Sequence, residues 1–203
     1  MPATIMEYDE LSVLYENEFG KGMIVHSSQD GKMYVKKIIN SGQSEVYERI
    51  QSLAYPSLPA IVAVHQQDDT LVVIQEYIQG TPFPKACSRT GAGNLRHMLM
   101  GLCEVIEYME LSMLGYRNLE LSAFVLAKNG ITRLPDYQLS ADFDNGYSLD
   151  FEDKVGLYKL ELLAAKLISQ SGHKMPRLYA SCQAHENKTY QDFRSKVKKF
   201  LFF

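Results

Sequence analysis

The chain has 203 residues, of which 46% are hydrophobic, and a formal net charge of -3. This length and apolar content suffice for a sizeable core in one domain or two small lobes. The charge balance gives no excess of positive charge for binding nucleic acid, which we exclude as a partner. The acidic start MPATIMEYDE lacks a basic and then apolar signal pattern, and no apolar run reaches the about 18 residues that a membrane helix needs.

The first part of the chain is predicted to form strands and one helix. Short runs rich in apolar and β-forming residues, separated by turn residues, are typical of strands at 11–18, 22–27, 33–39, 60–64 and 71–75. The pair Asp30-Gly31 between two of these runs predicts a tight hairpin turn. A helix is expected from about Ser44, with an apolar stripe at helical spacing formed by Val46, Ile50 and Leu53.

After Gly80 the pattern changes to a mostly helical one. Residues 81–93 are rich in turn formers and predict a connection. Asn94 is a candidate cap of a long helix whose apolar stripe is Leu95, Met98, Leu99, Leu102, Val105, Ile106 and Met109. Two short strands and two helices are expected at 123–126, 131–134, 150–168 and 189–201, with Thr189 capping the last helix. This order of elements argues for two segregated lobes of α+β character.

Several short stretches, in their order along the chain, resemble landmarks of protein kinases, notably bacterial ones. Residues 31–38 are similar to the third kinase strand, 45–61 to the helix with its partner glutamate, 71–80 to the fifth strand and hinge, and 187–193 to the start of the last helix. The resemblance implies one two-lobed kinase-like domain. Its N-lobe, residues 1–79, would hold a five-stranded antiparallel sheet plus one helix, and its reduced, mostly helical C-lobe would span residues 80–203.

The resemblance also implies a nucleotide site, with the cofactor-binding residues Lys36, Glu45, Glu76 and Asp136. Phosphoryl transfer needs a lysine that pairs the phosphates and a glutamate that holds the lysine, roles that fall on Lys36 and Glu45. Lys37 competes for the first role, and Glu48, one turn further along, is the alternative partner. Asp136 would bind magnesium, although an ordinary turn aspartate explains it equally well.

Other positions have lost groups that the transfer of phosphate requires. Asn118 stands where the family has the aspartate that accepts the substrate proton, and an amide has no basic lone pair at neutral pH. Ala123 replaces the metal-binding asparagine and has no oxygen ligand for magnesium. Glu120 replaces a lysine. The short segment between Asp136 and Asp153 leaves little room for a loop that binds a substrate peptide.

Two further positions of the implied site depart from a simple nucleotide pocket. The segment Gly20-Lys21-Gly22 contains Gly-x-Gly but not the longer glycine-rich pattern, and we favour a tight turn there. Gln75 would occupy the gatekeeper position and place an amide at the back of the adenine pocket.

We therefore expect a pseudokinase, a regulatory module with a protein partner and with weak or no binding of ATP and magnesium. The alternative is an atypical ATP-dependent phosphotransferase that uses Lys36, Glu45 and Asp136, with Glu120 or Asp142 as the base. The three scattered cysteines indicate reduced thiols, so we expect a cytoplasmic protein. Residues 198–203 are basic and then apolar, which suggests membrane attachment beyond the C-terminus; a helix end packed on the core explains them equally well.

Overall fold

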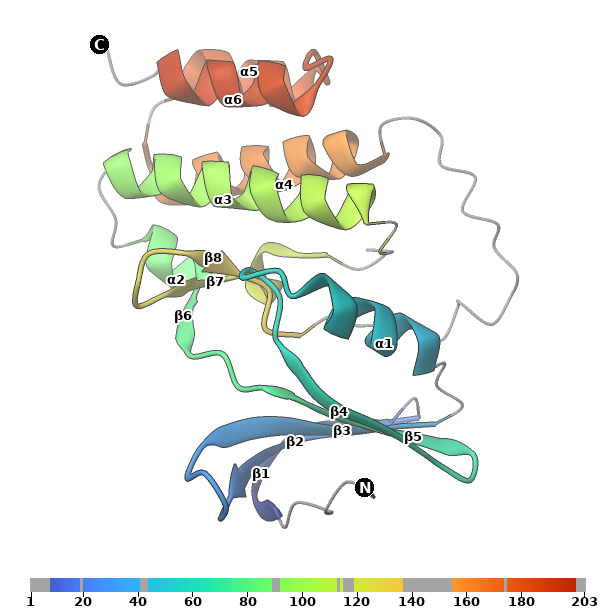
Figure 1. Cartoon of the computed structure of the whole chain (residues 1–203). Helices are drawn as coiled ribbons and strands as arrows, with labels where there is room; N and C mark the ends of the chain where they lie inside the picture. The colour runs from blue at the N-terminus through green and yellow to red at the C-terminus, as the bar shows by residue number, and fades with distance from the viewer. Residues whose placement is uncertain are drawn as a thin grey trace. The chain divides into compact units, whose positions relative to one another are not determined.

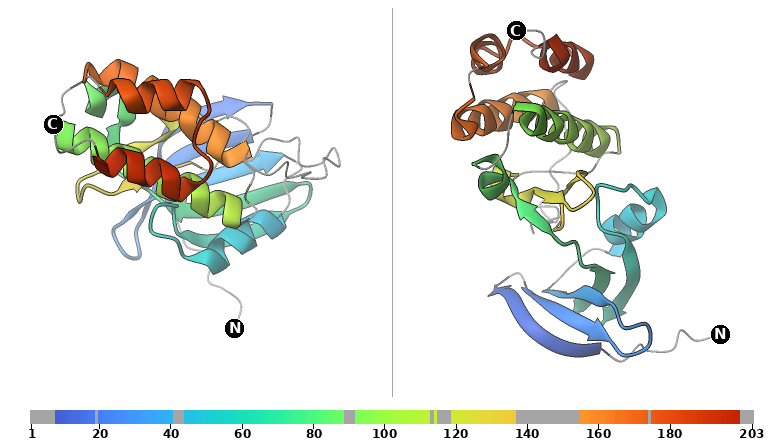
Figure 2. Two further views of the ribbon diagram at one scale, coloured as in Figure 1. Left: turned by 90° about the horizontal axis from the view of Figure 1, so that it is seen from above. Right: turned by 90° about the vertical axis from the view of Figure 1, so that its left-hand side faces the viewer.

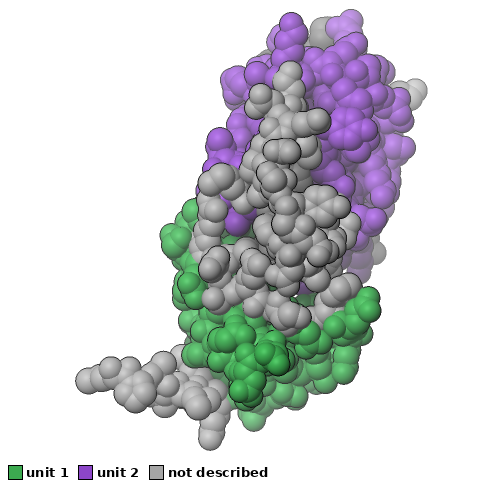
Figure 3. Space-filling model, turned by 90° about the vertical axis from the view of Figure 1, so that its right-hand side faces the viewer, with its two compact units in different colours: residues 1–78 green, residues 79–203 purple. Residues whose placement is uncertain are grey.

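The computed structural model describes residues 8–18, 20–40, 44–88, 92–112, 114, 119–136, 155–173 and 175–199. The chain divides into two compact units, residues 1–78 and 79–203 (Figure 3). This division lies one residue before the boundary expected between residues 79 and 80. Among the helices described, none has the length and apolar character needed to cross a membrane.

Unit 1 contains a five-stranded sheet and one helix (Figure 1). The strands are β1 (Tyr8–Asn17), β2 (Gly20–Ser27), β3 (Met33–Asn40), β4 (Ile61–Gln67) and β5 (Thr70–Glu76). They are ordered β1-β2-β3-β5-β4, and every neighbouring pair is antiparallel. The predicted α+β class, the five antiparallel strands and the accompanying helix are confirmed.

The turn between β2 and β3 forms where the sequence predicts it. Gly31 has a φ of +68°, a conformation that glycine adopts without steric cost. The N–H of Gly31 donates to the carbonyl oxygen of Ser27 at 2.9 Å, and the N–H of Ser27 donates to that of Lys32 at 2.9 Å. The carboxylate of Asp30 accepts the N–H of Lys32 at 3.1 Å, which stabilises the turn locally.

Helix α1 (Ser44–Leu53) covers part of the sheet beside β4. Tyr47 and Ile50 are buried, whereas Leu53 is half-buried. The amide of Gln51 donates to the carbonyl oxygen of Ile61 at 3.1 Å and fixes the helix to β4. The sequence stripe included Ile50 and Leu53 but missed Tyr47, since a tyrosine in a polar stretch gives no clear burial signal.

The two faces of the sheet bury different side chains. Gly22, Lys37 and Val73 are directly opposite one another on three adjacent strands, and opposite residues share a face. Tyr47 of α1 lies against Lys37 on this face. The other face carries a buried cluster made of Met23, Val25, Tyr34 and Ile74. Residues that alternate along β3 therefore meet two different environments.

Unit 2 is built around two long helices. Its elements are β6 (Gly80–Pro82), α2 (Phe83–Cys87), α3 (Ala92–Leu111), the 3-10 turn η1 (Leu121–Ala123), β7 (Val125–Ala127), β8 (Thr132–Arg133), α4 (Val155–Ser171), α5 (Pro176–Gln183) and α6 (Tyr190–Lys199). The pair α3 and α4 forms a central layer (Figures 1 and 2). On one side lie α2 and the small β6-β7-β8 sheet, and on the other lie α5 and α6.

The stripe predicted for the long helix is confirmed, because all seven of its side chains are fully buried in α3. Gly101 of α3 lets β8 approach closely: a β-carbon on Gly101 would lie 2.5 Å from Cβ of Thr132. Asn94 lies inside α3, which begins at Ala92, so its prediction as the cap is wrong.

The connection predicted for residues 81–93 is also wrong in part, because β6 and α2 occupy residues 80–87. Strand β6 pairs with β7, and Phe83 and Cys87 of α2 are buried. Pro84 lies in the first turn of α2, where a proline costs no hydrogen bond. Helix α5 (Pro176–Gln183) was not predicted from the sequence, and its proline likewise stands at the start of the helix.

A buried carboxylate ties α4 to the segment after α5. Glu161 of α4 is 2% exposed, and its Oε1 accepts the backbone N–H of Asn187 at 3.1 Å. The side-chain amide of Asn187 donates to the same oxygen, and Nδ1 of His185 lies 2.8 Å from Oε2. A buried charge is tolerated only with such partners, so this network fixes the chain path into α6.

Candidate functional site

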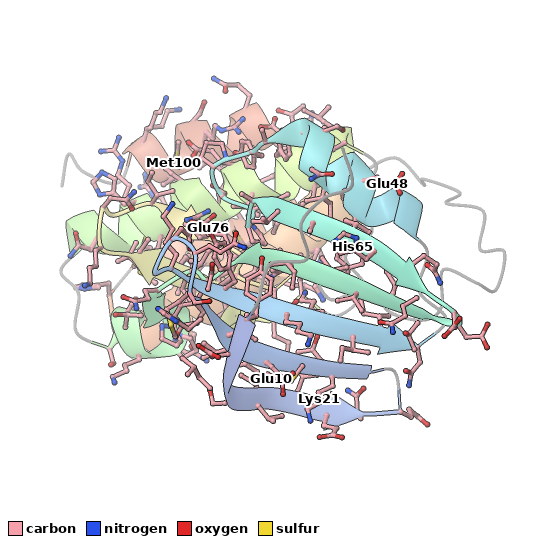
Figure 4. The ribbon with its side chains drawn as sticks, turned by 60° about the horizontal axis from the view of Figure 1, so that its bottom comes forward. Glu10, Lys21, Glu48, His65, Glu76 and Met100 are labelled. Carbon is pink, nitrogen blue, oxygen red and sulfur yellow. The ribbon has the colours of Figure 1, made fainter. Side chains whose placement is uncertain are left out.

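Lys36, the lysine expected to contact the nucleotide, points away from α1. Its Nζ lies 3.2 Å from Oε1 of Glu10, a residue of β1 that is labelled in Figure 4. The two side chains lie on the face of the Met23 and Val25 cluster, and both are partly solvent-exposed. This placement corrects the expected orientation of Lys36 toward the helix, because consecutive residues of a strand point to opposite faces.

Lys37, the competing lysine, is the one that faces α1. It is 1% exposed, and its Nζ lies 5.9 Å from the centre of the Tyr47 ring. An ammonium group removed from water needs compensating partners, and the face of an aromatic ring is one of them. The sequence favoured Lys36 wrongly, because both lysines have apolar neighbours two residues away on β3 and local pattern does not show which face α1 covers.

The glutamates expected to hold the lysine lie on α1. Glu45 is part of the helix, but its side chain lies outside the described residues, so its pairing with a lysine stays a prediction. Glu48, the alternative partner, is exposed on α1 (Figure 4).

Gly20 and Gly22 are held by packing within the sheet. Gly20 opens β2 with a φ of +145°, and a β-carbon there would collide with the backbone of Ile38 and Ile39. Gly22 lies inside β2 with the ring of Tyr15 directly over it. The expected tight turn is therefore wrong for Gly22, whose missing side chain makes room for an aromatic ring.

Gln75 and Glu76 end β5. Gln75 is 1% exposed and lies opposite Val35 of β3, on the same face as Lys37. Glu76 is tied to the start of β4, because its N–H donates to the carbonyl oxygen of Ala60 at 2.8 Å. Its carboxylate also accepts the N–H of Ala60 at 3.2 Å. Glu76, labelled in Figure 4, thus has a structural role in joining two strands.

In unit 2, the described part of the implied site offers few ligands for a cation. Ala123 ends η1 and is half-buried, and its N–H donates to the carbonyl oxygen of Glu120 at 3.0 Å. Glu120 is exposed, and Asp136 is half-buried after β8. Within the ranges described, no group of three or more His, Cys, Asp or Glu side chains is arranged to hold a metal ion. The role of Asp136 in binding magnesium stays a prediction.

Several predicted positions lie outside the described residues. They are Asn118, Asp142, Asp153 and residues 200–203. Their assigned roles stay predictions from the sequence.

The chain is similar to serine/threonine protein kinases, although no protein-family model matches it. RAC-beta serine/threonine-protein kinase of Rattus norvegicus is 25% identical over 152 residues, covering 68% of this chain and 32% of that protein. Serine/threonine-protein kinase nrc-2 of Neurospora crassa is 25% identical over 154 residues, covering 68% of this chain and 25% of that protein. Serine/threonine-protein kinase N2 of Danio rerio is 18% identical over 187 residues, covering 84% and 19%.

These similarities support a kinase-like relationship. The kinase-like chain spans between 19% and 32% of the length of the three relatives named above. These three relatives come from two animals and a fungus. The bacterial character expected from the sequence stays a prediction.

Proposed function

We propose that this chain is a kinase-like domain that does not transfer phosphate and acts as a regulatory, protein-binding module. The observation that carries the proposal is the alanine at position 123. Its methyl group stands where the resemblance implies a metal-binding asparagine, and a methyl group cannot coordinate magnesium. The loss of the basic aspartate at Asn118 supports the same conclusion from the sequence.

Within this proposal, ATP binds weakly or not at all, and Lys37 provides the phosphate contact. Lys37 is the buried lysine of the sheet, whereas Lys36 is paired with Glu10 on the opposite face. Because Asp136 is left without the second oxygen ligand at position 123, magnesium neutralises the triphosphate poorly. We expect a dissociation constant in the high micromolar range or weaker, which corresponds to a binding free energy of roughly -5 to -6 kcal/mol.

The alternative function is an atypical ATP-dependent phosphotransferase, and the burial of Lys37 favours it. Burying an ammonium group costs free energy. A lysine that is nevertheless buried beside an aromatic ring is held in one position, as the lysine of a nucleotide site must be. Lys37 then takes the role first assigned to Lys36, Glu45 orients it, and Asp136 binds the metal. Glu120 or Asp142 would replace the missing base.

Calorimetry with ATP, with and without magnesium, tests the proposal together with a phosphorylation assay on the same protein. We expect weak binding, little gain from magnesium, and no incorporation of phosphate above background. Lys37→Met should abolish the residual ATP binding, and the matched control Lys36→Met should leave it unchanged. Thermal melting of both variants verifies that they are folded.

Two results would overturn the proposal. Sub-micromolar, magnesium-dependent binding would show a working nucleotide site. Autophosphorylation that is lost in Lys37→Met but kept in Lys36→Met would establish the phosphotransferase instead.

The proposal also includes a protein partner and a cytoplasmic location. The three cysteines are free and buried, which fits a reducing compartment. Cross-linking in cells followed by mass spectrometry tests the partner, and recovery of the chain only as an uncross-linked monomer would speak against it. A fluorescent fusion tests the location.

A further inference from the structure

The ring of Tyr15 on β1 lies over Gly22 on β2. A β-carbon on Gly22 would lie only 2.7 Å from Cζ of the ring and 3.0 Å from its Cδ1. Real β-carbons do not approach other atoms so closely, so the ring occupies the space that a side chain at position 22 would need. Gly22 is buried beneath it, whereas Tyr15 itself is half-buried.

The ring lies on the same face of the sheet as Lys37. Tyr15 pairs with Gly22, and Gly22 pairs with Lys37, so the three residues form one row across β1, β2 and β3. Directly opposite residues of antiparallel strands point to the same face. From β1, the Tyr15 side chain therefore extends over β2 in the direction of Lys37.

Lys37 itself is buried, and the ring of Tyr47 lies beside it. Tyr47 of α1 lies 5.9 Å from its Nζ, and Lys37 is 1% exposed. An anion can therefore reach the ammonium group only after a covering group moves. Tyr47 is 2% exposed and belongs to the packed face of α1, whereas Tyr15 is half-buried on an edge strand. Tyr15 is thus the ring that moves at the lower cost.

We propose that Tyr15 determines which ligands reach Lys37, and that its ring must leave Gly22 before a phosphate group can contact this lysine. The inference rests on the proposed function, in which Lys37 is the phosphate-contacting residue. A glycine offers a phosphate close approach to the backbone, and Tyr15 covers that surface. The ligand class is a nucleoside triphosphate, which competes with the Tyr15 ring for the surface above Gly22.

ATP titration of variants at position 15 tests this competition. Tyr15→Val removes the ring and keeps a residue that favours strands, so we expect ATP to bind about tenfold more tightly than to the natural chain. Tyr15→Phe keeps the ring and should bind as weakly as the natural chain. Tyr8→Val is the matched control, because Tyr8 lies on the same strand but packs edge-on against Tyr34 on the other face.

A double variant connects the effect to the lysine. Lys37→Met combined with Tyr15→Val should lose the tenfold gain, because the ammonium group that the phosphate contacts is gone. If Tyr15→Val does not fold, as judged by thermal melting, Tyr15→Ala replaces it with the same expected gain.

The outcomes separate this inference from the proposed function. Unchanged weak binding in folded Tyr15→Val would overturn the role of Tyr15 and leave the proposed function intact. Sub-micromolar, magnesium-dependent binding by the natural chain would overturn the proposed function. The ratio of the ATP dissociation constants of the natural chain and of Tyr15→Val would still measure the effect of the ring. An equal gain in Tyr8→Val would also contradict the inference, since that ring is on the opposite face.

Discussion

At the scale of single residues, neighbours on one strand have different chemistry because they face different surroundings. Lys36 is paired with Glu10 at a partly solvated position, and such exposed pairs contribute little to stability. Lys37, one residue further along, is buried beside Tyr47. A substitution of one lysine therefore cannot stand in for a substitution of the other, which is why the pair serves as a matched test of the site.

A second residue-scale feature is the hydrogen bond between Tyr34 and Asp30. The hydroxyl of Tyr34 donates to Oδ2 of Asp30 at 2.6 Å. This bond is the main reason that the pKa of Tyr34 is raised to about 12, and it also lowers the pKa of Asp30 below its usual value. A raised tyrosine pKa stabilises the fold below pH 10, and the stabilisation is lost as the pH rises through about 12.

We predict that Tyr34→Phe lowers the free energy of unfolding at pH 7. The variant should also lose less stability than the natural chain between pH 9 and pH 12 (about pH 10 being the ordinary tyrosine value), because the titrating hydroxyl is gone. At low pH the sign is the reverse for Asp30, whose stabilisation is present above its ordinary pKa and lost as the pH falls through the lowered one. Urea unfolding at a series of pH values measures both effects. Tyr158→Phe, at an exposed position, is the control, and identical pH profiles for Tyr34→Phe and the natural chain would contradict the prediction.

At the scale of secondary-structure elements, α6 begins at a side-chain cap. Oγ1 of Thr189 accepts the N–H of Asp192 at 3.0 Å, which confirms Thr189 as the predicted cap. The carboxylate of Asp192 accepts the N–H of Lys188 at 3.3 Å, so two backbone donors at this end are satisfied. The helix is then held on α3 by the ion pair between Arg194 and Glu107.

We predict that Thr189→Ala costs about 1 kcal/mol of unfolding free energy, the usual contribution of a lost N-cap. Thr189→Ser keeps the hydroxyl and should stay within a few tenths of a kcal/mol of the natural chain. Urea unfolding followed by circular dichroism measures both variants. Equal losses in the two variants would mean that the threonine methyl group, rather than the cap, stabilises this end of α6.

At the scale of the whole molecule, all three cysteines lie in unit 2. Cys87, Cys103 and Cys182 are free and buried. Burial raises the pKa of Cys103 and of Cys182 to about 12, so their thiols carry almost no reactive thiolate at neutral pH.

We predict that the native protein reacts slowly with a thiol reagent at pH 7 to 8 (roughly the range in which an unperturbed thiol begins to ionise), and that all three cysteines react once it is unfolded. Since unit 1 contains no cysteine, the labelling rate follows the opening of unit 2 alone. Mass spectrometry of the labelled chain counts the modified thiols. Rapid labelling of all three in the folded state would contradict their burial.

How far the sequence predicts this protein depends on the distance over which each signal acts. The buried stripe of α3, the turn at Asp30-Gly31 and the cap at Thr189 were all predicted correctly. Each depends on residues within a few positions of one another, where periodicity and turn chemistry act directly. The five strands of unit 1 follow from the same kind of signal, repeated between turns, and their antiparallel arrangement was implied by the resemblance to kinases. The sequence by itself therefore determined the α+β class and most of the elements.

Only the tertiary structure decided which side chains meet. The choice between Lys36 and Lys37 depends on the face of β3 that α1 covers, and a shift of one residue exchanges the two faces. The ring of Tyr15 over Gly22 depends on the register of β1 against β2. Strand β6 and helix α2 form in a proline-rich segment because β7 and α4 offer them partners, which local propensity does not encode. Contacts between residues distant in sequence thus determine which side chains form the candidate site, whereas the sequence had already indicated most of the elements.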